Sequence, residues 1–186
     1  MKRELRKIML EQLTEVDAAT VSVHSLAVAQ RLASIPTYRA AESLAVYVSF
    51  GTEIETHDLI RQLLAVGRQV CIPTFRAGGY QLAEIRDFDR DLSPGKLGIL
   101  EAKLVRPVPV SRPNVWLVPG LAFDRSGNRL GRGKGYFDAL LTHASGVKIA
   151  LAHDFQLLSE VPTEAHDVQL DFIVTEAQVL QKTKEL

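Results

Sequence analysis

The chain has 186 residues, of which 46% are hydrophobic and 24% are charged. These proportions are typical of a folded globular protein and exclude long disordered or fibrous segments. Twenty-two basic side chains balance twenty-two acidic ones, so the formal net charge is zero. The chain as a whole therefore has no attraction for nucleic acid or for an anionic membrane, and any polyanion must be bound by a local cluster of positive charge.

The single cysteine, Cys71, excludes an internal disulfide and a zinc site built from cysteines. It lies in the apolar run 70–72, which predicts a buried, inert thiol rather than a nucleophile. The basic N-terminus lacks the continuous apolar stretch of a signal peptide. The longest apolar runs are well short of the roughly 20 residues of a membrane-spanning helix. We therefore expect a soluble, cytoplasmic protein with no membrane partner.

The first half of the chain predicts helices that alternate with strands. Apolar residues at helical spacing predict helices over 2–14, about 17–34 and 57–66. Apolar runs of strand length predict strands over 44–50 and 69–75, followed by a more exposed strand over 80–85. Ile35-Pro36 ends the second helix, because the residue before proline disfavours helix. Thr56 is placed to cap the third helix, which ends at Gly67.

The second half begins with residues 86–113, which are rich in proline, glycine and charge and which we interpret as loops. Beyond them, apolar runs predict strands over 115–118, 148–152 and 172–175, with a helix over 134–143. Buried strands that alternate with helices predict a mostly parallel sheet covered on both faces. The expected fold class is α/β, a single three-layer α/β/α domain over residues 1–186.

The segment 118–138 carries the clearest functional signal. It joins a predicted strand to a predicted helix, which is where open α/β sheets bind ligands. Between Asp124 and Asp138 the charged side chains are all basic and alternate with glycines; they are Arg125, Arg129, Arg132 and Lys134, with Gly131, Gly133 and Gly135 between and after them. Glycines let the backbone approach a ligand, and a helix N-terminus adds positive potential. The pattern predicts a phosphate-binding loop, with a solvated glycine-rich turn as the alternative.

Two common phosphate motifs do not fit this segment. A Walker A loop needs glycine where Asn128 stands and Ser or Thr where Gly135 stands. The dinucleotide fingerprint needs glycine at the position of Tyr136. Asp138, four residues after Lys134, fits either a helical ion pair worth ~0.3 kcal/mol or a magnesium ligand beside the phosphates.

The N-terminal helix carries like charges in adjacent turns. Lys2 and Arg6, and likewise Arg3 and Lys7, are i,i+4 pairs at the positive end of the helix dipole. Each pair costs a few tenths of a kcal/mol, roughly, unless something offsets the repulsion. Either a frayed terminus tolerates the cost, or a bound anion removes it.

The motif 127–138, preceded by 119–124, resembles the signature of the 5-formyltetrahydrofolate cyclo-ligase family, also called 5,10-methenyltetrahydrofolate synthetases. Supporting likenesses lie along nearly the whole chain, at 2–6, 50–56, 94–101, 167–171 and 174–175. The resemblance implies a three-layer α/β/α fold related to the ribose-phosphate isomerase and CoA-transferase group. It also implies that ATP and Mg²⁺ drive the conversion of 5-formyltetrahydrofolate to 5,10-methenyltetrahydrofolate, with release of ADP and phosphate.

The resemblance also implies roles for individual residues. Those near the transferred phosphoryl group are Arg132, Lys134 and Tyr136. Those that contact ATP are Lys2, Arg3, Arg6, Arg129, Leu130, Gly131, Arg132, Gly133, Lys134, Gly135, Tyr136 and Phe137. Those that contact the folate are Phe50, Glu55, Arg132, Gly133, Lys134, Gly135 and Tyr136. Asp138 and Asp171 would hold Mg²⁺.

Other interpretations of these residues stand beside the family roles. Phe50 also fits a core aromatic, Glu55 a surface carboxylate and Asp171 a turn residue. The partners implied are the two small-molecule substrates, with no nucleic acid, and the protein is expected to be a monomer.

Three positions depart from the family pattern, namely Ala102, Leu97 and Phe137. They bear on folate packing rather than on the phosphate chemistry. The dipeptides His153-Asp154 and His166-Asp167 would suit a metal-dependent phosphohydrolase, but loop histidines at strand ends account for them better. A non-catalytic folate or nucleotide sensor and an RNA-binding module are the competing function classes. The presence of Lys134, Asp138 and Asp171 together disfavours the sensor, and the zero net charge disfavours the RNA-binding module.

Overall fold

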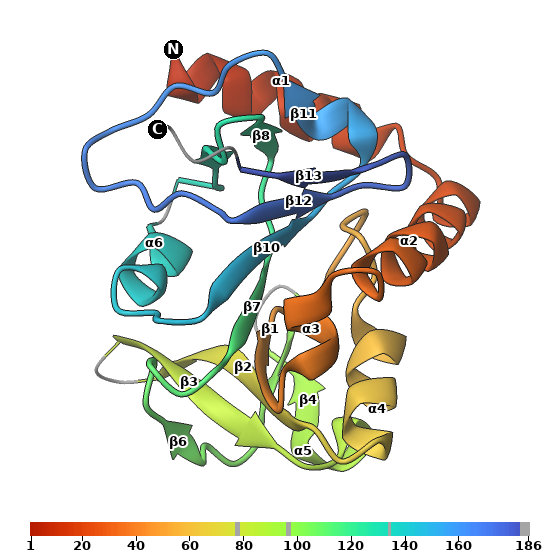
Figure 1. Ribbon diagram of the computed structural model, residues 1–186, viewed down its shortest axis with the longest axis vertical. Coiled ribbons are helices and arrows are strands. Elements are labelled where there is room, and N and C mark those ends of the chain that lie inside the picture. Colours follow the sequence, from red (N-terminus) through yellow and green to blue (C-terminus); the bar gives the residue numbers. More distant parts are fainter. Residues whose placement is uncertain (77–78, 96–97, 134, 183–186) are drawn as a thin grey trace.

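A mixed sheet runs through the centre of the protein in the computed structural model (Figure 1), which describes residues 1–76, 79–95, 98–133 and 135–182. Within these residues the sheet has eight strands in the order β13–β12–β10–β7–β1–β2–β3–β6. In that order their bounds are Val179–Gln181, Phe172–Val174, Val147–Leu151, Val115–Val118, Ser43–Val46, Gln69–Arg76, Gly79–Ile85 and Pro107–Val108.

The predicted α/β class is confirmed, and the sheet is a mixed one in which parallel pairing is confined to the central strands. Parallel pairing joins the five central strands, β12, β10, β7, β1 and β2. The outer strands β13, β3 and β6 pair antiparallel with their neighbours. β3 and β13 follow their partners after short connections, and a short connection allows only an antiparallel neighbour, because a parallel one needs a long crossover.

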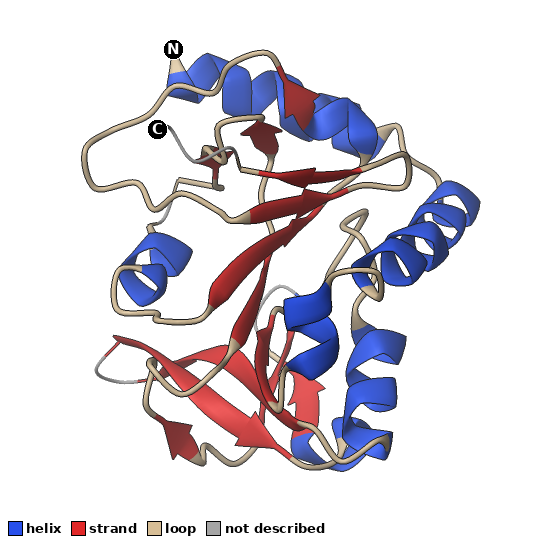
Figure 2. Cartoon of the chain, viewed as in Figure 1, coloured by secondary structure: helices blue, strands red, loops and turns tan. Residues whose placement is uncertain are grey.

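Side chains of the central strands alternate between two buried cores. Leu44 and Val46 of β1 face the core formed with α2 (Ala18–Leu32), α3 (Pro36–Ala40) and α4 (His57–Ala65), whereas Ala45 faces the opposite core. That second core includes Leu140 and Leu141 of α6 (Tyr136–Leu141). Helices therefore cover both faces of the sheet, as the buried apolar runs predicted (Figure 2).

The N-terminal helix α1 (Lys2–Thr14) packs on a second, smaller sheet (Figure 1). This sheet has the order β11–β8–β9, with bounds Leu157–Leu158, Ala122–Asp124 and Arg129–Leu130. Met9 and Leu13 of α1 share a buried cluster with Leu130 of β9 and with Leu121. This apolar contact holds the start of the chain near residues 131–135, which follow β9 and are called the glycine-rich segment.

The interpretation of residues 86–113 as loops is wrong. This stretch contains the short helix α5 (Phe88–Asp91) and the short strands β4 (Leu92–Pro94), β5 (Leu100–Ala102) and β6. β4 and β5 form a two-stranded sheet. The elements are short, but Phe88, Leu92 and Ala102 are buried in the main core and anchor them. Ala102, one of the departures from the family pattern, thus fills a core position.

The strand predicted over 44–50 is shorter in the structure, because β1 ends at Val46. The helix predicted over 134–143 is also shorter and begins at Tyr136, while Lys134 lies outside the described residues. Cys71 is buried as predicted, and burial raises the pKa of its thiol to about 11. Among the helices described here, none combines the length and the apolar character needed to cross a bilayer.

Candidate functional site

The connections that follow the parallel strands gather at the carboxyl edge of the sheet. The loop 47–56 follows β1, residues 119–121 follow β7, and residues 152–156 follow β10. Ligands bind at this edge in open α/β sheets, because loops from several strands converge there. From the glycine-rich segment, the side chain of Arg132 reaches the same region.

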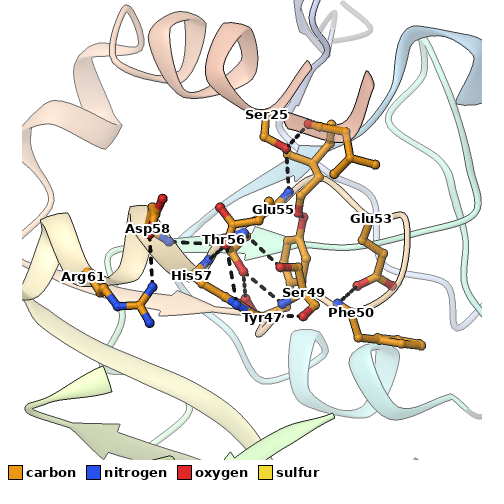
Figure 3. Close-up of polar contacts among 12 residues, drawn as sticks. Ser25, Tyr47, Ser49, Phe50, Glu53, Glu55, Thr56, His57, Asp58 and Arg61 are labelled. Atoms are coloured by element: carbon orange, nitrogen blue, oxygen red, sulfur yellow. Dashed lines mark hydrogen bonds and ion pairs between the residues drawn. The ribbon is translucent and has the colours of Figure 1, made fainter. Parts of the chain in front are cut away.

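Buried side-chain hydrogen bonds hold the loop after β1 in shape (Figure 3). The hydroxyl of Thr56 donates to the carbonyl of Tyr47 at 2.7 Å and accepts the Ser49 N–H at 3.0 Å. The hydroxyl of Ser49 accepts the Thr56 N–H at 3.0 Å, and the phenol of Tyr47 donates to the carbonyl of Ile54 at 2.8 Å. These bonds replace the ladder of a longer strand, which is why β1 ends early although the sequence remains apolar.

The same loop presents Phe50 and Glu53 to the glycine-rich segment. Glu53 accepts the Phe50 N–H at 3.2 Å and pairs with Arg132 at 3.1 Å between Oε1 and Nη2. Its side chain is 12% exposed, and this burial raises the pKa of its carboxyl, although Arg132 opposes the shift. A partly desolvated carboxylate of this kind is a strong acceptor for N–H groups.

Glu55 has a different environment from Glu53. Its carboxylate accepts the first N–H groups of α4, from His57 and from Asp58 (Figure 3). It thus does the capping work that the sequence assigned to Thr56, whose hydroxyl is used inside the loop. The contact between Glu55 and folate stays a prediction. The carboxylate beside Phe50 and Arg132 is that of Glu53, which the sequence reasoning missed.

Arg132 joins the two predicted binding regions. Its guanidinium carbon lies 4.6 Å from the centre of the Phe50 ring, and its Nη2 atom reaches Glu53. The side chain remains 40% exposed. A cation stacked on an aromatic ring and paired with a carboxylate keeps a fixed position while its remaining N–H donors stay accessible.

Arg6 of α1 lies across the glycine-rich segment. Its Nε atom donates to the carbonyl of Gly131 at 2.9 Å. A methyl group added at Gly133, whose φ is +92°, would come within 3.3 Å of the same Nε atom. The structure therefore brings Arg6 and the segment together, as the resemblance implied. Arg3 lies on the exposed side of the helix.

Lys2 is neutralised by carboxylates of the protein itself. Its Nζ atom lies 2.7 Å from Asp167 and 3.3 Å from Glu164. Partial burial disfavours the charge on Lys2, but its hydrogen bonds to the two carboxylates outweigh this effect and raise the pKa of Lys2. Desolvation of Asp167 favours its neutral form, but the contact with Lys2 outweighs this effect and lowers the pKa of Asp167. Part of the repulsion at the start of α1 is thus offset within the fold. Lys2 as an ATP ligand stays a prediction.

Arg129 and Asp138 form a buried pair behind the glycine-rich segment. The Nη2 and Oδ1 atoms are 2.6 Å apart, and the Arg129 side chain is 4% exposed. Arg129 also donates to the carbonyl of Pro119 at 3.3 Å, and its guanidinium lies 5.9 Å from the Phe137 ring. Phe137, which stands where the family pattern has a tyrosine, packs against both cores. Leu130 is buried under α1.

The glycines of the segment have the conformations that favour glycine. Gly133 and Gly135 have φ of +92° and +68°, in the left-handed region, and Gly135 is the N-cap of the short helix α6. Lys134, the central cation of the motif, and Leu97 lie outside the described residues.

The carboxylates predicted to hold magnesium lie in different surroundings. Asp138 pairs with Arg129, and Asp171 accepts the backbone N–H of Lys148 at 2.8 Å at the amino end of β12. In the described part of the chain, each keeps one carboxylate oxygen without a hydrogen-bond partner. Carboxylate oxygens are donors that suit Mg²⁺, which needs one or two of them beside substrate phosphates. Each carboxylate therefore offers an oxygen that suits the ion, and Asp138 is the closer of the two to the glycine-rich segment in the chain.

A buried histidine supports the Phe50–Glu53 loop from behind. The Nε2 atom of His153 lies 2.8 Å from the carbonyl of Thr52, and the side chain is fully buried. Burial lowers the pKa of His153, because the charged form of its ring is disfavoured away from water. The sequence placed this residue at a strand end, as observed after β10, but gave no sign of its contact with Thr52.

The fold and the site define a class of α/β protein in which a cationic, glycine-rich segment faces an aromatic ring and a carboxylate at the carboxyl edge of the sheet. The chain belongs to the 5-formyltetrahydrofolate cyclo-ligase family, whose model matches residues 1–176.

Proteins named 5-formyltetrahydrofolate cyclo-ligase are similar over most of their length. The one from Escherichia coli K12 is 36% identical over 81% of this chain and 87% of its own, and the one from Mycolicibacterium smegmatis is 32% identical over 94% and 93%. The solved structure of 5,10-methenyltetrahydrofolate synthetase from Aquifex aeolicus superposes with a TM-score of 0.88 at 29% identity, covering 100% of this chain and 94% of that one. The family assignment made from the motif is thereby confirmed.

Proposed function

We infer that this protein is an ATP-dependent 5-formyltetrahydrofolate cyclo-ligase, which converts 5-formyltetrahydrofolate to 5,10-methenyltetrahydrofolate. Family membership and relatives of that name support the reaction. The observation that carries the assignment to this site is the side chain of Arg132, which runs from the glycine-rich segment to Phe50 and Glu53. One cation thus touches the regions proposed for both substrates.

The chemistry explains why the site is rich in cations. The formyl group on the 5-nitrogen is an amide whose oxygen is a poor leaving group. Transfer of the γ-phosphoryl group of ATP to that oxygen releases ADP and activates the formyl carbon. The 10-nitrogen of the same molecule then attacks this carbon, loses its proton, and phosphate leaves as the C–O bond breaks. Phosphoryl transfer depends mostly on positioning and charge neutralisation, and ring closure on holding the folate bent.

For the folate, we propose Phe50 as the surface on which the pterin ring packs and Glu53 as the acceptor of its N–H groups. Phe50 is half-buried and held by its own backbone bond to Glu53. Glu55, the residue that the motif suggested, contributes by fixing the start of α4. The described residues of the glycine-rich segment, from Gly131 to Gly133 and at Gly135, would close over the folate together with Lys134 and Tyr136.

For ATP, we propose that Arg6, Arg132 and Lys134 neutralise the triphosphate and that the backbone from Gly131 to Gly135 approaches it closely. Arg6 already lies on this segment. Arg129, Leu130 and Phe137 act by packing beneath it, since their side chains are engaged in the buried pair and the cores. Lys2 and Arg3 would contribute at the outer end of α1.

We propose that Asp138 and Asp171 bind Mg²⁺ together with phosphate oxygens of ATP. The ion would neutralise negative charge on these oxygens. Asp138 is held in place by Arg129, and Asp171 by the backbone of Lys148.

The remaining proposals concern the setting of the enzyme. We propose that residues 1–186 form one domain of the ribose-phosphate isomerase and CoA-transferase-like group, which the parallel centre of the sheet supports. The enzyme is proposed to be a cytoplasmic monomer that works on small molecules. The zero net charge supports the part of this proposal that excludes a nucleic acid or an anionic membrane as partner.

The direct test mixes the protein with 5-formyltetrahydrofolate, ATP and Mg²⁺ and follows the near-ultraviolet absorbance of the methenyl product. We expect product only when all three are present. Lys134→Ala should lower turnover by about 10³-fold or more, as loss of a phosphate-neutralising cation does. Lys103→Ala, an exposed lysine of the loop after β5, is the matched control. Binding of both substrates without product would identify a sensor instead, and full turnover by Lys134→Ala would remove that residue from the reaction.

A further inference from the structure

Two histidines and a glutamate from three distant parts of the chain meet behind the Phe50–Glu53 loop. His24 lies on α2, His153 follows β10, and Glu176 follows β12. One potential ligand atom from each lies within 4.8 Å of the other two. The Nδ1 atoms of the histidines are 2.9 Å apart, and the Nδ1 atom of His24 is 3.5 Å from Oε1 of Glu176. The proposed reaction uses none of them.

The contacts around this cluster fix which atoms carry protons. A carbonyl only accepts, so the Nε2 atom of His153 must donate its proton to Thr52 at 2.8 Å. In the tautomer with its proton on Nε2, the Nδ1 atom of His153 carries a lone pair directed at the Nδ1 atom of His24. The other oxygen of Glu176 accepts the backbone N–H of Asp154 at 2.9 Å. An imidazole whose second nitrogen donates to a backbone carbonyl, beside an anchored carboxylate, is the usual surrounding of a metal ligand.

We propose that His24, His153 and Glu176 bind a divalent transition-metal ion of the zinc type. Two imidazole nitrogens and one carboxylate oxygen are a donor set typical of zinc, with a fourth position left for water. Tetrahedral zinc with bonds near 2.0–2.1 Å separates its ligand atoms by about 3.3 Å. The observed separations of 2.9 and 3.5 Å lie on either side of this value, so small side-chain movements suffice. Imidazole donors favour such an ion over Mg²⁺.

An ion has a route to the cluster. A surface cavity of about 370 Å³ is lined by His24 together with Glu15, Asp17 and Phe155. The carboxylates of Glu15 and Asp17 favour the approach of a cation. The side chains of His24 and Glu176 are 24% and 21% exposed, so two of the three ligands can be reached while His153 stays buried.

Metal binding at this place would affect the loop in front of it. His153 holds the carbonyl of Thr52, which lies in the chain between Phe50 and Glu53. An ion that fixes His153 would tie α2 and the ends of β10 and β12 to this loop. The inference stands on the cluster alone and does not depend on the proposed reaction.

A second cluster of possible ligands carries no such proposal. Glu164, His166 and Asp167 also lie close together, but the Nζ atom of Lys2 is 2.7 Å from Asp167. A positive charge at that distance disfavours a cation. This cluster instead provides a control, because His166 is 73% exposed and easily replaced.

The test uses the full chain, freed of metal by a chelator and without ATP or folate. Titration with Co²⁺ should give one equivalent with the intense visible absorption of four-coordinate cobalt, and Zn²⁺ should displace it. By calorimetry, His24→Ala and Glu176→Gln should each weaken Zn²⁺ binding by at least about tenfold. His166→Ala and the exposed His143→Ala should bind Zn²⁺ as the parent does.

Several results would overturn the proposal: a six-coordinate cobalt spectrum, the absence of one-to-one Zn²⁺ binding, or the same affinity in His24→Ala as in the parent. Because His153 is fully buried, His153→Ala can fail to fold. The two variants at the partly exposed positions keep the test decisive, and their melting curves without metal check that they fold.

Discussion

The two sides of the site are built in opposite ways. The loop after β1 is fixed by buried hydrogen bonds among Tyr47, Ser49 and Thr56 before any ligand arrives. The described part of the glycine-rich segment is instead held by contacts with other parts of the fold: Arg6 of α1 donates to the carbonyl of Gly131, and Arg132 of the segment donates to Glu53. A rigid surface suits the flat pterin ring of a folate that must be held bent. A glycine backbone suits a triphosphate that it must approach closely.

After the loss of Lys134, the change with the largest expected effect removes the cation that joins the two sides. Arg132→Ala should lower turnover by about 10²–10³-fold, the usual cost of losing one donor that stabilises developing charge. The Michaelis constants for both substrates should rise, because the side chain touches both regions. Initial rates of methenyl formation measure this.

Arg125→Ala is the matched control for Arg132, because it removes an exposed cation of the same motif. Its turnover should equal that of the parent. If Arg132→Ala raised only the Michaelis constant for ATP, the contacts of Arg132 with Phe50 and Glu53 would stabilise the fold without contributing to folate binding.

The next test concerns the two carboxylates proposed to bind Mg²⁺. Asp138→Asn should shift the Mg²⁺ titration of activity upward by about 10–100-fold, and Asp171→Asn by less, since Asp171 is bonded at the amino end of β12. Asp138→Asn also removes the charge partner of buried Arg129, so its melting temperature should fall.

Asp138→Glu separates the two effects, because it keeps the charge and moves the oxygens. It should recover stability more than metal affinity. An unchanged Mg²⁺ titration in Asp138→Asn would exclude Asp138 as a ligand.

Glu53→Gln tests the rigid side and distinguishes two carboxylates. It should raise the Michaelis constant for the folate by about tenfold, as loss of a charged hydrogen bond of ~1.5 kcal/mol does, with ATP little affected. Glu55→Gln should change the folate constant less, because that side chain faces α4. Equal effects, or the reverse order, would restore Glu55 as the folate contact.

The same variant has a predictable pH dependence of stability. Burial raises the pKa of Glu53 in the folded protein, so the folded state binds its proton more tightly than the unfolded state does. The free energy of unfolding of the parent therefore falls as the pH rises from the pKa of Glu53 in the unfolded chain through its raised pKa in the folded protein. Glu53→Gln lacks this ionisable group, so its stability does not fall for this reason. Without ligands, its melting temperature should exceed that of the parent at pH 7 but not at pH 4. A constant difference across this range would contradict the raised pKa.

The smallest expected effect comes from loosening the rigid loop. Thr56→Val keeps the shape but leaves the Ser49 N–H and the Tyr47 carbonyl without their partner, at a cost of about 1–3 kcal/mol. The melting temperature should fall by a few degrees, about 2–4 °C per kcal/mol, and the folate constant should rise more than the ATP constant. Thr14→Val, the same change at an exposed position of α1, should alter neither.

The difference between the two sides also explains what the sequence could reveal. The glycine-rich segment has a local signal, because its cations and glycines are contiguous, and the apolar run of β7 marked a strand that is observed at Val115–Val118. The loop after β1 has no such signal. Whether Glu53 or Glu55 faces Phe50 depends on hydrogen bonds between side chains and backbone. In the sequence the two glutamates simply flank Ile54, and nothing distinguishes one from the other.

Elements that depend on distant partners were equally hidden. The strands between residues 92 and 108 are only two or three residues long, and they exist because a few anchors such as Leu92 and Ala102 are buried by the rest of the fold. The cluster of His24, His153 and Glu176 spans residues far apart in the chain with no spacing that a motif would show. Only the fold brings these groups together.

The most direct test of the central claim is a crystal structure with 5-formyltetrahydrofolate and a non-hydrolysable ATP analogue. We expect the γ-phosphate against the backbone from Gly131 to Gly135, the pterin ring on Phe50, and Arg132 between the two ligands. A nucleotide bound away from the glycine-rich segment, or a folate that does not touch Phe50 or Glu53, would contradict it.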